Sequence, residues 1–155
     1  MIIIRDTREK KEYFTFSSFA DVSVIQKKVD VGDYTIRGHE NRITVDRKRN
    51  TGELQINFGQ QSARFQKEFE RMACMERAYF VCAFPYSDLD IFPVNSGIPK
   101  KTWKYLRVNG RFLKRKIHEI EEQYKNISFV FCDDAISAEQ VTYKIFQEYL
   151  ECQHS

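Results

Sequence analysis

Two continuous apolar runs constrain the fold of this chain more than any other sequence feature. Residues 78–84 read AYFVCAF, and residues 127–132 form a similar run that is interrupted by a single serine. A strand with one face in water alternates apolar and polar residues, whereas an unbroken run of this length is typical of a strand covered on both faces. The sequence therefore predicts a central sheet with helices packed on both sides.

Four shorter segments near the start of the chain also have the pattern of strands, at residues 2–5, 24–29, 33–36 and 43–47. Gly32 allows a tight bend before the third of them. Residues 38–41 begin with Gly and end with Asn, which suits a hairpin turn between the last two segments. Such a hairpin places Asp33 and Asp46 on neighbouring strands.

Helical spacing appears after residue 52. Residues 49–52 have the composition of a loop, and a helix is expected to start near Ser62 with Phe65, Phe69 and Met72 on one face. The two phenylalanines at this spacing are better explained as core residues than as base-stacking groups.

Two more helices are predicted in the second half of the chain. The first carries an apolar stripe (Leu113, Ile117, Ile120 and Tyr124), and residues 109–110 separate it from a basic segment that begins near Pro99. Ser137 and Gln140 have the spacing of a capping box, which would open a last helix that buries Val141, Ile145 and Tyr149. Strands first, and then alternating helices and strands, indicate an α/β sandwich with a mixed sheet.

Composition restricts the class of protein. The chain has 155 residues, 42% of them hydrophobic and 30% charged, which favours one folded domain and argues against disorder. The four cysteines are too far apart to form a C-x-x-C pair, and no apolar run has the length of a membrane span. We expect an intracellular protein, cytoplasmic or nucleoid-associated in a bacterial or phage-infected cell.

Three acidic residues follow or end the predicted strands, namely Asp6, Asp33 and Asp46. Carboxylates that converge at strand ends can hold Mg²⁺, which takes one or two protein carboxylates and leaves positions for water and phosphate oxygens. Alternation along a strand places Lys48 on the same side as Asp46 and turns Arg47 away. An Asp followed about a dozen residues later by Asp/Glu-x-Lys is the signature of PD-(D/E)XK nucleases.

The segments around these residues resemble the nuclease domain of the XPF family of structure-specific endonucleases. The likeness lies in DTRE at residues 6–9, VGDY at 31–34 and VDRK at 45–48, in this order and spacing. The helix at residues 64–72 and the strand after it resemble short, stand-alone bacterial and phage versions. The resemblance extends from residue 2 to about residue 84. It implies a restriction-endonuclease-like α/β/α sandwich over residues 1–155, without a helix-hairpin-helix module.

The resemblance also implies roles for individual residues. The family's metal ligands correspond to Asp6, Asp33 and Asp46, and its catalytic lysine corresponds to Lys48. The implied cofactor is Mg²⁺, with Mn²⁺ as a substitute. Arg8 and Arg47 occupy the places of family arginines that lie near the scissile phosphate or in charge networks that hold the site.

Two positions depart from the family pattern. Asp46 stands where the family usually has Glu, and Gly52 stands where the family has an Asp shortly after the lysine. Glu53 comes directly after Gly52. Either Glu53 replaces the missing carboxylate or its role is absent.

A basic stretch in the second half of the chain has no acidic residue over residues 100–116. Its eight basic residues are Lys100, Lys101, Lys104, Arg107, Arg111, Lys114, Arg115 and Lys116. We expect this stretch to contact DNA phosphates, although a solvated helix face is the alternative. Trp103 and Tyr105 within it would either stack on unpaired bases or anchor the segment to the core. Arg64 and Lys67 are further candidates for DNA contact.

The sequence thus favours a metal-dependent DNA endonuclease acting at branched, flap or junction DNA. A homodimer or a partner subunit would supply additional DNA contacts, and no membrane is involved. The alternative from another class is a catalytically inactive DNA-binding or scaffolding domain on the same fold. Simpler explanations exist for single residues: a surface ion pair for Asp6 and Arg8, a turn for Asp33, and a solvated strand end for residues 46–49.

Overall fold

A single mixed sheet organises the protein. The computed structural model describes residues 1–9 and 13–154. The strands are β1 (Ile2–Arg5), β2 (Ser23–Gln26), β3 (Tyr34–Ile36), β4 (Ile43–Lys48), β5 (Arg77–Cys82) and β6 (Ile127–Phe131), and their order in the sheet is β2-β1-β3-β4-β5-β6. Strand β3 is antiparallel to both of its neighbours, while β1 and β2, and likewise β4, β5 and β6, run parallel to one another.

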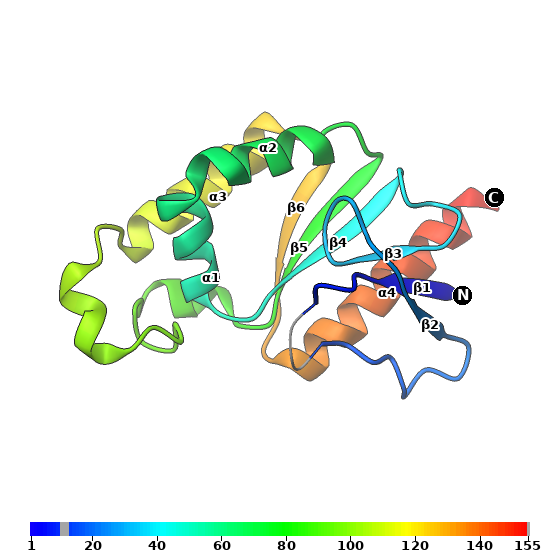
Figure 1. Ribbon diagram of the computed structural model, residues 1–155, viewed down its shortest axis with the longest axis horizontal. Helices are drawn as coiled ribbons and strands as arrows, with labels where there is room; N and C mark the ends of the chain where they lie inside the picture. Colours follow the sequence, from blue (N-terminus) through cyan, green and yellow to red (C-terminus); the bar gives the residue numbers. More distant parts are fainter. Residues whose placement is uncertain (10–12, 155) are drawn as a thin grey trace.

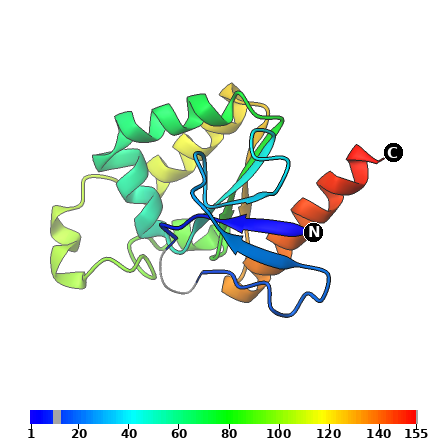
Figure 2. The same ribbon diagram turned by 45° about the vertical axis from the view of Figure 1, so that its right-hand side comes forward.

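Helices cover both faces of this sheet, as the apolar runs predict. On one face lie α1 (Thr51–Gln55), the π-helical turn η1 (Ile56–Gln60), α2 (Ser62–Met72) and α3 (Gly110–Gln123), and α4 (Ala135–Gln153) packs against the other face (Figure 1). The turned view separates these two layers (Figure 2). The predicted α/β sandwich with a mixed sheet is therefore confirmed.

Strand β5 shows why the run at residues 78–84 is continuous. Phe80 packs into the core under α2 and α3, and the next residue, Val81, packs into the core under α4. Both side chains are fully buried. Because burial of such a side chain contributes about 1.5–3 kcal/mol, a strand of this kind stabilises both layers at once.

Strand β2 is shorter than predicted. It ends at Gln26 rather than at residue 29, because the chain then leaves the sheet. The backbone N–H of Val29 donates to Asp6 Oδ1 at 3.0 Å instead of to a neighbouring strand. The segment at residues 27–31 therefore runs beside the sheet and forms a wall next to it.

Two helix starts also differ from the predictions, and an N-cap side chain explains each. Residues 49–52 are not all loop, because Asn50 Oδ1 accepts the Glu53 N–H at 3.1 Å and α1 begins at Thr51. The last helix begins at Ala135, where Asp134 forms the capping box with Ser137. The buried residues of α4 shift accordingly to Ala138, Thr142, Phe146 and Tyr149, and the predicted Val141 and Ile145 are half-buried.

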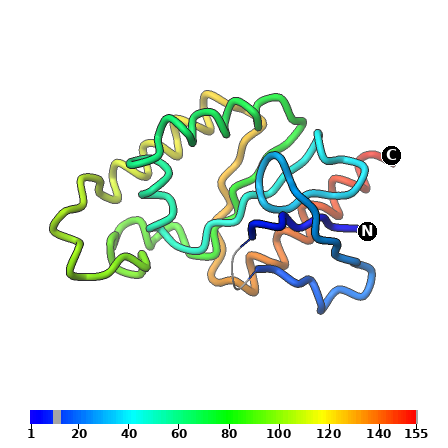
Figure 3. The backbone as a smooth tube through the Cα atoms, in the orientation of Figure 1, coloured from blue at the N-terminus to red at the C-terminus, as the bar shows by residue number. Residues whose placement is uncertain are grey.

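The segment between β5 and α3 projects beyond the end of the sheet (Figure 3). It contains two short 3-10 helices, η2 (Tyr86–Leu89) and η3 (Lys100–Tyr105). None of the described helices combines the length and the apolar composition needed to span a lipid bilayer.

Candidate active site

Gly32 brings the first candidate carboxylate against β4. Its φ of +80° is favourable for glycine, and a Cβ atom here would lie 2.2 Å from Thr44 Oγ1. The next residue, Asp33, donates its N–H to Val45 O at 2.9 Å, and its Oδ2 accepts the Arg47 N–H at 2.7 Å. Asp33 is thus held beside Asp46 by both backbone and side chain, as the predicted hairpin requires.

Alternation along β4 divides its charged residues between the two faces. Lys48 Nζ lies 2.9 Å from Asp46 Oδ1 and 5.2 Å from the centre of the Phe65 ring, on the α2 side. Arg47 lies on the other side, against Phe14. These three charged residues of β4 are only 4–8% exposed. A solvated strand end is therefore excluded for them, and the predicted directions of Asp46, Arg47 and Lys48 are confirmed.

Burial makes the charged form of both Asp33 and Asp46 less favourable, and Asp46 adds to this effect on Asp33. Burial raises the pKa of Asp33 well above its usual range, and the charge of Asp46 raises it further. Burial also raises the pKa of Asp46, against the opposing effect of Lys48. Burial alone would lower the pKa of Lys48, but the charges of Asp46 and Asp33 outweigh it and keep the ammonium protonated. The site therefore holds more negative charge than Lys48 can balance.

Asp6 lines the same cavity as Asp33 and Asp46, but both of its carboxylate oxygens already accept hydrogen bonds. Its Oδ1 accepts the Val29 N–H at 3.0 Å, and its Oδ2 accepts Arg8 Nε at 2.9 Å. The predicted ion pair exists, although only Arg8 is at the surface: its side chain is 65% exposed and that of Asp6 is 4% exposed. Asp6 positions the segment at residues 27–31, and its role as a metal ligand stays a prediction.

Arg47 belongs to a buried charge network beside the two carboxylates. Its Nε lies 3.1 Å from Glu9 Oε2, and the two side chains are 2% and 7% exposed. Of the two roles that the resemblance allows for Arg47, the contact with Glu9 matches the charge network that holds the site.

Gly52 cannot readily be replaced by the family's Asp in this structure. Its N–H donates to Ser96 O at 3.2 Å, and a Cβ atom would lie 2.3 Å from that oxygen. The neighbouring Glu53 accepts Arg49 Nε at 2.8 Å and lines a small cavity together with Asp33 and Asp46. Glu53 thus brings a carboxylate near the site from the position adjacent to Gly52.

Glu68 is a site residue that the sequence reasoning missed. It lies on α2 and lines the same cavity as Asp33 and Asp46. Burial raises its pKa, and the charge of Asp46 raises it further. The available signal was its spacing: Glu68 follows Arg64 by four residues and precedes Arg71 by three, so one acid interrupts a basic helix face.

The donor set suits a hard divalent cation. Asp33 and Asp46 lie in one cavity of about 380 Å³, and their raised pKa values show that added positive charge would be favourable there. In residues 1–9 and 13–154, no group of three or more His, Cys, Asp or Glu residues is arranged to hold a metal. Since Mg²⁺ is commonly held by one or two carboxylates and several waters, Asp33 and Asp46 fit this requirement.

The predicted DNA-binding residues occupy two places. Arg64 and Lys67 line the cavity that also contains Asp33 and Asp46. The eight basic residues at 100–116 lie on the projection and on α3, where Lys114 pairs with Asp90, and Arg115 and Lys116 pair with Glu119. Trp103 is half-buried and donates to Ile98 O at 2.9 Å, so it anchors the segment, while Tyr105 is 71% exposed.

Comparison with known proteins supports this fold. No protein-family model and no curated protein sequence matches the chain. Among solved structures, XPF from Aeropyrum pernix matches 96% of this chain with a TM-score of 0.66 and 18% identity. XPF from Aeropyrum pernix in complex with DNA matches 97% with a TM-score of 0.65 and 18% identity. This chain covers 61% and 65% of those two chains, and it has an XPF-like nuclease fold.

Proposed function

We propose that this protein is a Mg²⁺-dependent endonuclease that hydrolyses phosphodiester bonds of DNA at branched, flap or junction structures. The observation that supports this most directly is the pairing of the half-buried Asp33 and the buried Asp46 with the buried Lys48 at the end of β4. This arrangement occurs in a fold shared with XPF structures, one of which was solved in complex with DNA.

Each residue has a defined task in this proposal. Asp33 and Asp46 would hold Mg²⁺, which supplies Lewis-acid stabilisation of the phosphate charge and of the attacking water. Lys48 is protonated, so its Nζ acts as a hydrogen-bond donor that orients the water and stabilises charge on the phosphate, and it does not act as a base. The attacking water gives up a proton to solvent as its oxygen bonds to phosphorus, the bond between phosphorus and the leaving oxygen breaks, and that oxygen takes up a proton from solvent.

The experiment is a cleavage assay with end-labelled duplex, flap and fork DNAs, each with Mg²⁺, Mn²⁺ or a chelator. We expect cleavage with either metal, none with the chelator, and faster cleavage of the flap and fork than of the duplex. DNA binding without cleavage under every condition would instead support an inactive DNA-binding or scaffolding domain. Cleavage that persists in the chelator would refute the metal dependence.

Glu53 provides a separate test of the departure at Gly52. If Glu53 supplies the carboxylate that the family carries at the preceding position, Glu53→Ala should lower the single-turnover rate without weakening DNA binding. The loss of one supporting carboxylate should be about 10-fold to 100-fold. Glu122→Ala, on the exposed side of α3, is the matched control. If the Glu53→Ala protein cleaves at the rate of the parent protein, Glu53 has no role in cleavage and only pairs with Arg49.

A further inference from the structure

A second cavity adjoins the cavity lined by Asp33 and Asp46, which is the catalytic cavity in the proposed function. It has a volume of about 510 Å³ and lies between residues 27–31, the turn between β3 and β4, and the end of α2. Asp30 and Arg71 line both cavities, so the two share a boundary. We call the second cavity the side groove. None of the residue roles predicted from the sequence or implied by the resemblance concerns the side groove.

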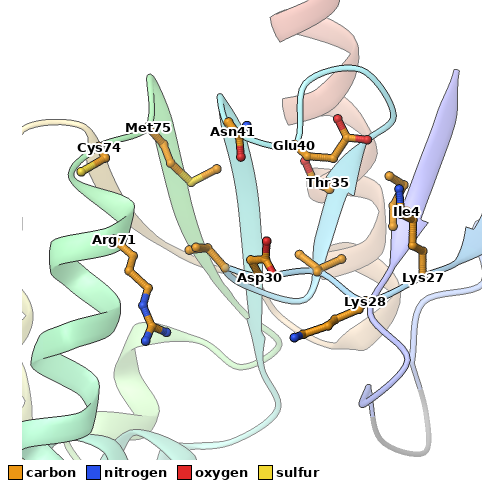
Figure 4. A pocket seen from close by; sticks show the side chains of 12 residues that line it. Ile4, Lys27, Lys28, Asp30, Thr35, Glu40, Asn41, Arg71, Cys74 and Met75 are labelled. Carbon is orange, nitrogen blue, oxygen red and sulfur yellow. The ribbon is translucent and has the colours of Figure 1, made fainter.

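Two cations reach into the side groove from opposite walls. Figure 4 shows Lys28 on the segment after β2 and Arg71 on α2, with Asp30 between them. Among the residues that the structure describes, neither cation forms an ion pair, whereas Lys114, Arg115 and Lys116 on α3 each have an acidic partner. Lys28 and Arg71 are therefore available to an external anion.

Helix α2 connects these cations to the catalytic carboxylates. Arg64 and Lys67 line the catalytic cavity, and Arg71, seven residues after Arg64, lines both cavities. Seven residues of α-helix span about 10 Å. Three basic residues of α2 thus extend from the cavity of Asp33 and Asp46 to the side groove, with Glu68 between Lys67 and Arg71, and they could follow a chain of several phosphates.

The walls of the side groove suit nucleotides that are not paired. Val31 is half-buried and contributes apolar surface, Ile4 and Met75 are buried and contribute little, and Asn41 and Glu40 contribute an amide and a carboxylate. A hollow of this volume can take a nucleotide, as small-ligand sites of similar size do, but it cannot take a duplex. Apolar contacts of this kind read little sequence, which is appropriate for an enzyme that recognises DNA structure.

We propose that the side groove holds a single-stranded DNA arm that continues from the strand at the catalytic carboxylates, with its phosphates on Lys28 and Arg71. This inference rests on the proposed function, because it names the substrate class of the same site: DNA with an unpaired arm next to the cleavage position. Asp30 opposes the phosphates and limits the affinity for the arm.

Binding measurements test the proposal with cleavage prevented. In an Asp46→Asn background, Lys28→Ala/Arg71→Ala should weaken binding of a fork with a 5′ or 3′ single-stranded arm by about tenfold, and should lower the salt slope by about 1.4, or 0.7 for each lost contact with a single strand. Binding of a blunt duplex should change less than about twofold. Lys125→Ala/Lys144→Ala removes two exposed charges elsewhere and should change neither, while Asp30→Asn should strengthen binding of the fork.

The cysteines provide a second readout in the same protein. Cys74 is exposed and lines the side groove, Cys152 is exposed on α4, and Cys82 and Cys132 are buried. Alkylation by N-ethylmaleimide, followed by mass spectrometry, should show Cys74 protected by the armed fork and not by blunt duplex. The rate at Cys152 should not change with either DNA and serves as an internal control.

The outcomes separate the two proposals. If the parent protein cleaves forks but the Lys28→Ala/Arg71→Ala protein binds them normally and Cys74 stays reactive, the side-groove proposal is wrong and the nuclease assignment stands. Equal weakening on the blunt duplex would also overturn it, since the cations would then act as general DNA attractors. If the parent protein binds no DNA, both proposals fail. Unchanged thermal melting of the variants excludes misfolding as the cause of a loss.

Discussion

The charges at the end of β4 and the charges at residues 100–116 lie in opposite environments. Asp46, Arg47 and Lys48 are less than 10% exposed and have fixed partners. The basic residues of the projection, such as Lys100 and Lys101, are exposed, and Arg115 and Lys116 on α3 make surface ion pairs. The sequence shows both regions as runs of charge, but the structure makes one a preorganised site and the other a solvated surface.

This difference determines how each region should respond to substitution. Coulomb interactions are strong and weakly screened where side chains are buried, whereas exposed charges are screened by salt and water. A single change near β4 should therefore alter catalysis or stability strongly. Changes in the projection should act gradually, additively and with a clear dependence on salt.

The largest expected effect is on cleavage. Asp33→Asn and Asp46→Asn should each lower the Mg²⁺-dependent rate by at least about 10³-fold, because each removes a carboxylate that would hold the Mg²⁺ needed to stabilise charge on the phosphate. Asp90→Asn, which changes an exposed carboxylate beside Lys114, should cleave at the parent rate. Single-turnover assays on the fork substrate measure all three. Full activity of either buried variant would refute the active-site assignment.

The next effect in size concerns stability. Glu9→Gln removes the charge that faces Arg47, whose guanidinium is 2% exposed, and should lower the free energy of unfolding by about 3 kcal/mol. Glu122→Gln on the exposed face of α3 should change it by less than about 0.5 kcal/mol. Urea unfolding followed by circular dichroism gives both values. A Glu9→Gln protein as stable as the control would show that this pair contributes nothing to the fold.

A smaller effect distinguishes the two carboxylates from each other. Asp33→Asn should raise the melting temperature of the metal-free protein at pH 7 by about 2–4 °C, because it removes a negative charge that partial burial and Asp46 disfavour and keeps an oxygen for the Arg47 N–H. Asp46→Asn should raise the melting temperature by less, since it also removes the ion pair between Asp46 and Lys48. An equal or larger gain for Asp46→Asn would contradict this account.

The same prediction has a definite pH dependence. A carboxyl group whose folded pKa is raised binds its proton more tightly in the folded state, so its contribution to stability falls as pH rises from the unfolded pKa, about 4, through the folded value. The advantage of Asp33→Asn should therefore be small near pH 4 and should grow toward pH 7. Melting curves across this range, recorded with a chelator, measure it.

The smallest effect is expected in the projection. Replacing Lys100, Lys101 and Lys104 together by Ala should weaken DNA binding about threefold at physiological salt, and should lower the salt slope by about 0.9 for each lost duplex phosphate contact. Fluorescence anisotropy at several ionic strengths, in the Asp46→Asn background, measures both quantities. If affinity and slope are unchanged, the projection is an ordinary charged surface, and the DNA contacts must lie nearer the catalytic cavity.

Several features could be predicted from sequence because they depend on local periodicity. The continuous run at residues 78–84 predicted a strand buried on both faces, and alternation along β4 predicted that Arg47 turns away from Asp46 and Lys48. The same prediction for residues 127–132 was wrong, because β6 is an edge strand with only two of its five residues buried. The Gly32 bend and the hairpin turn predicted that Asp33 lies beside Asp46. These inferences need only the geometry of neighbouring residues in the chain.

Other features were decided by contacts between distant residues, which no local pattern contains. The chain leaves the sheet after β2, and the Val29 N–H then donates to Asp6. Gly52 replaces the Asp of the family because Ser96 O lies where a side chain at residue 52 would begin. Glu68 reaches the site only because α2 packs over β4 and β5, and the side groove exists only because residues 27–31 run beside α2. Sequence by itself indicated the six strands, the three longer helices and the directions of the charged residues of β4. Tertiary packing decided which charges are buried together, because burial and pairing depend on what the rest of the chain places around them.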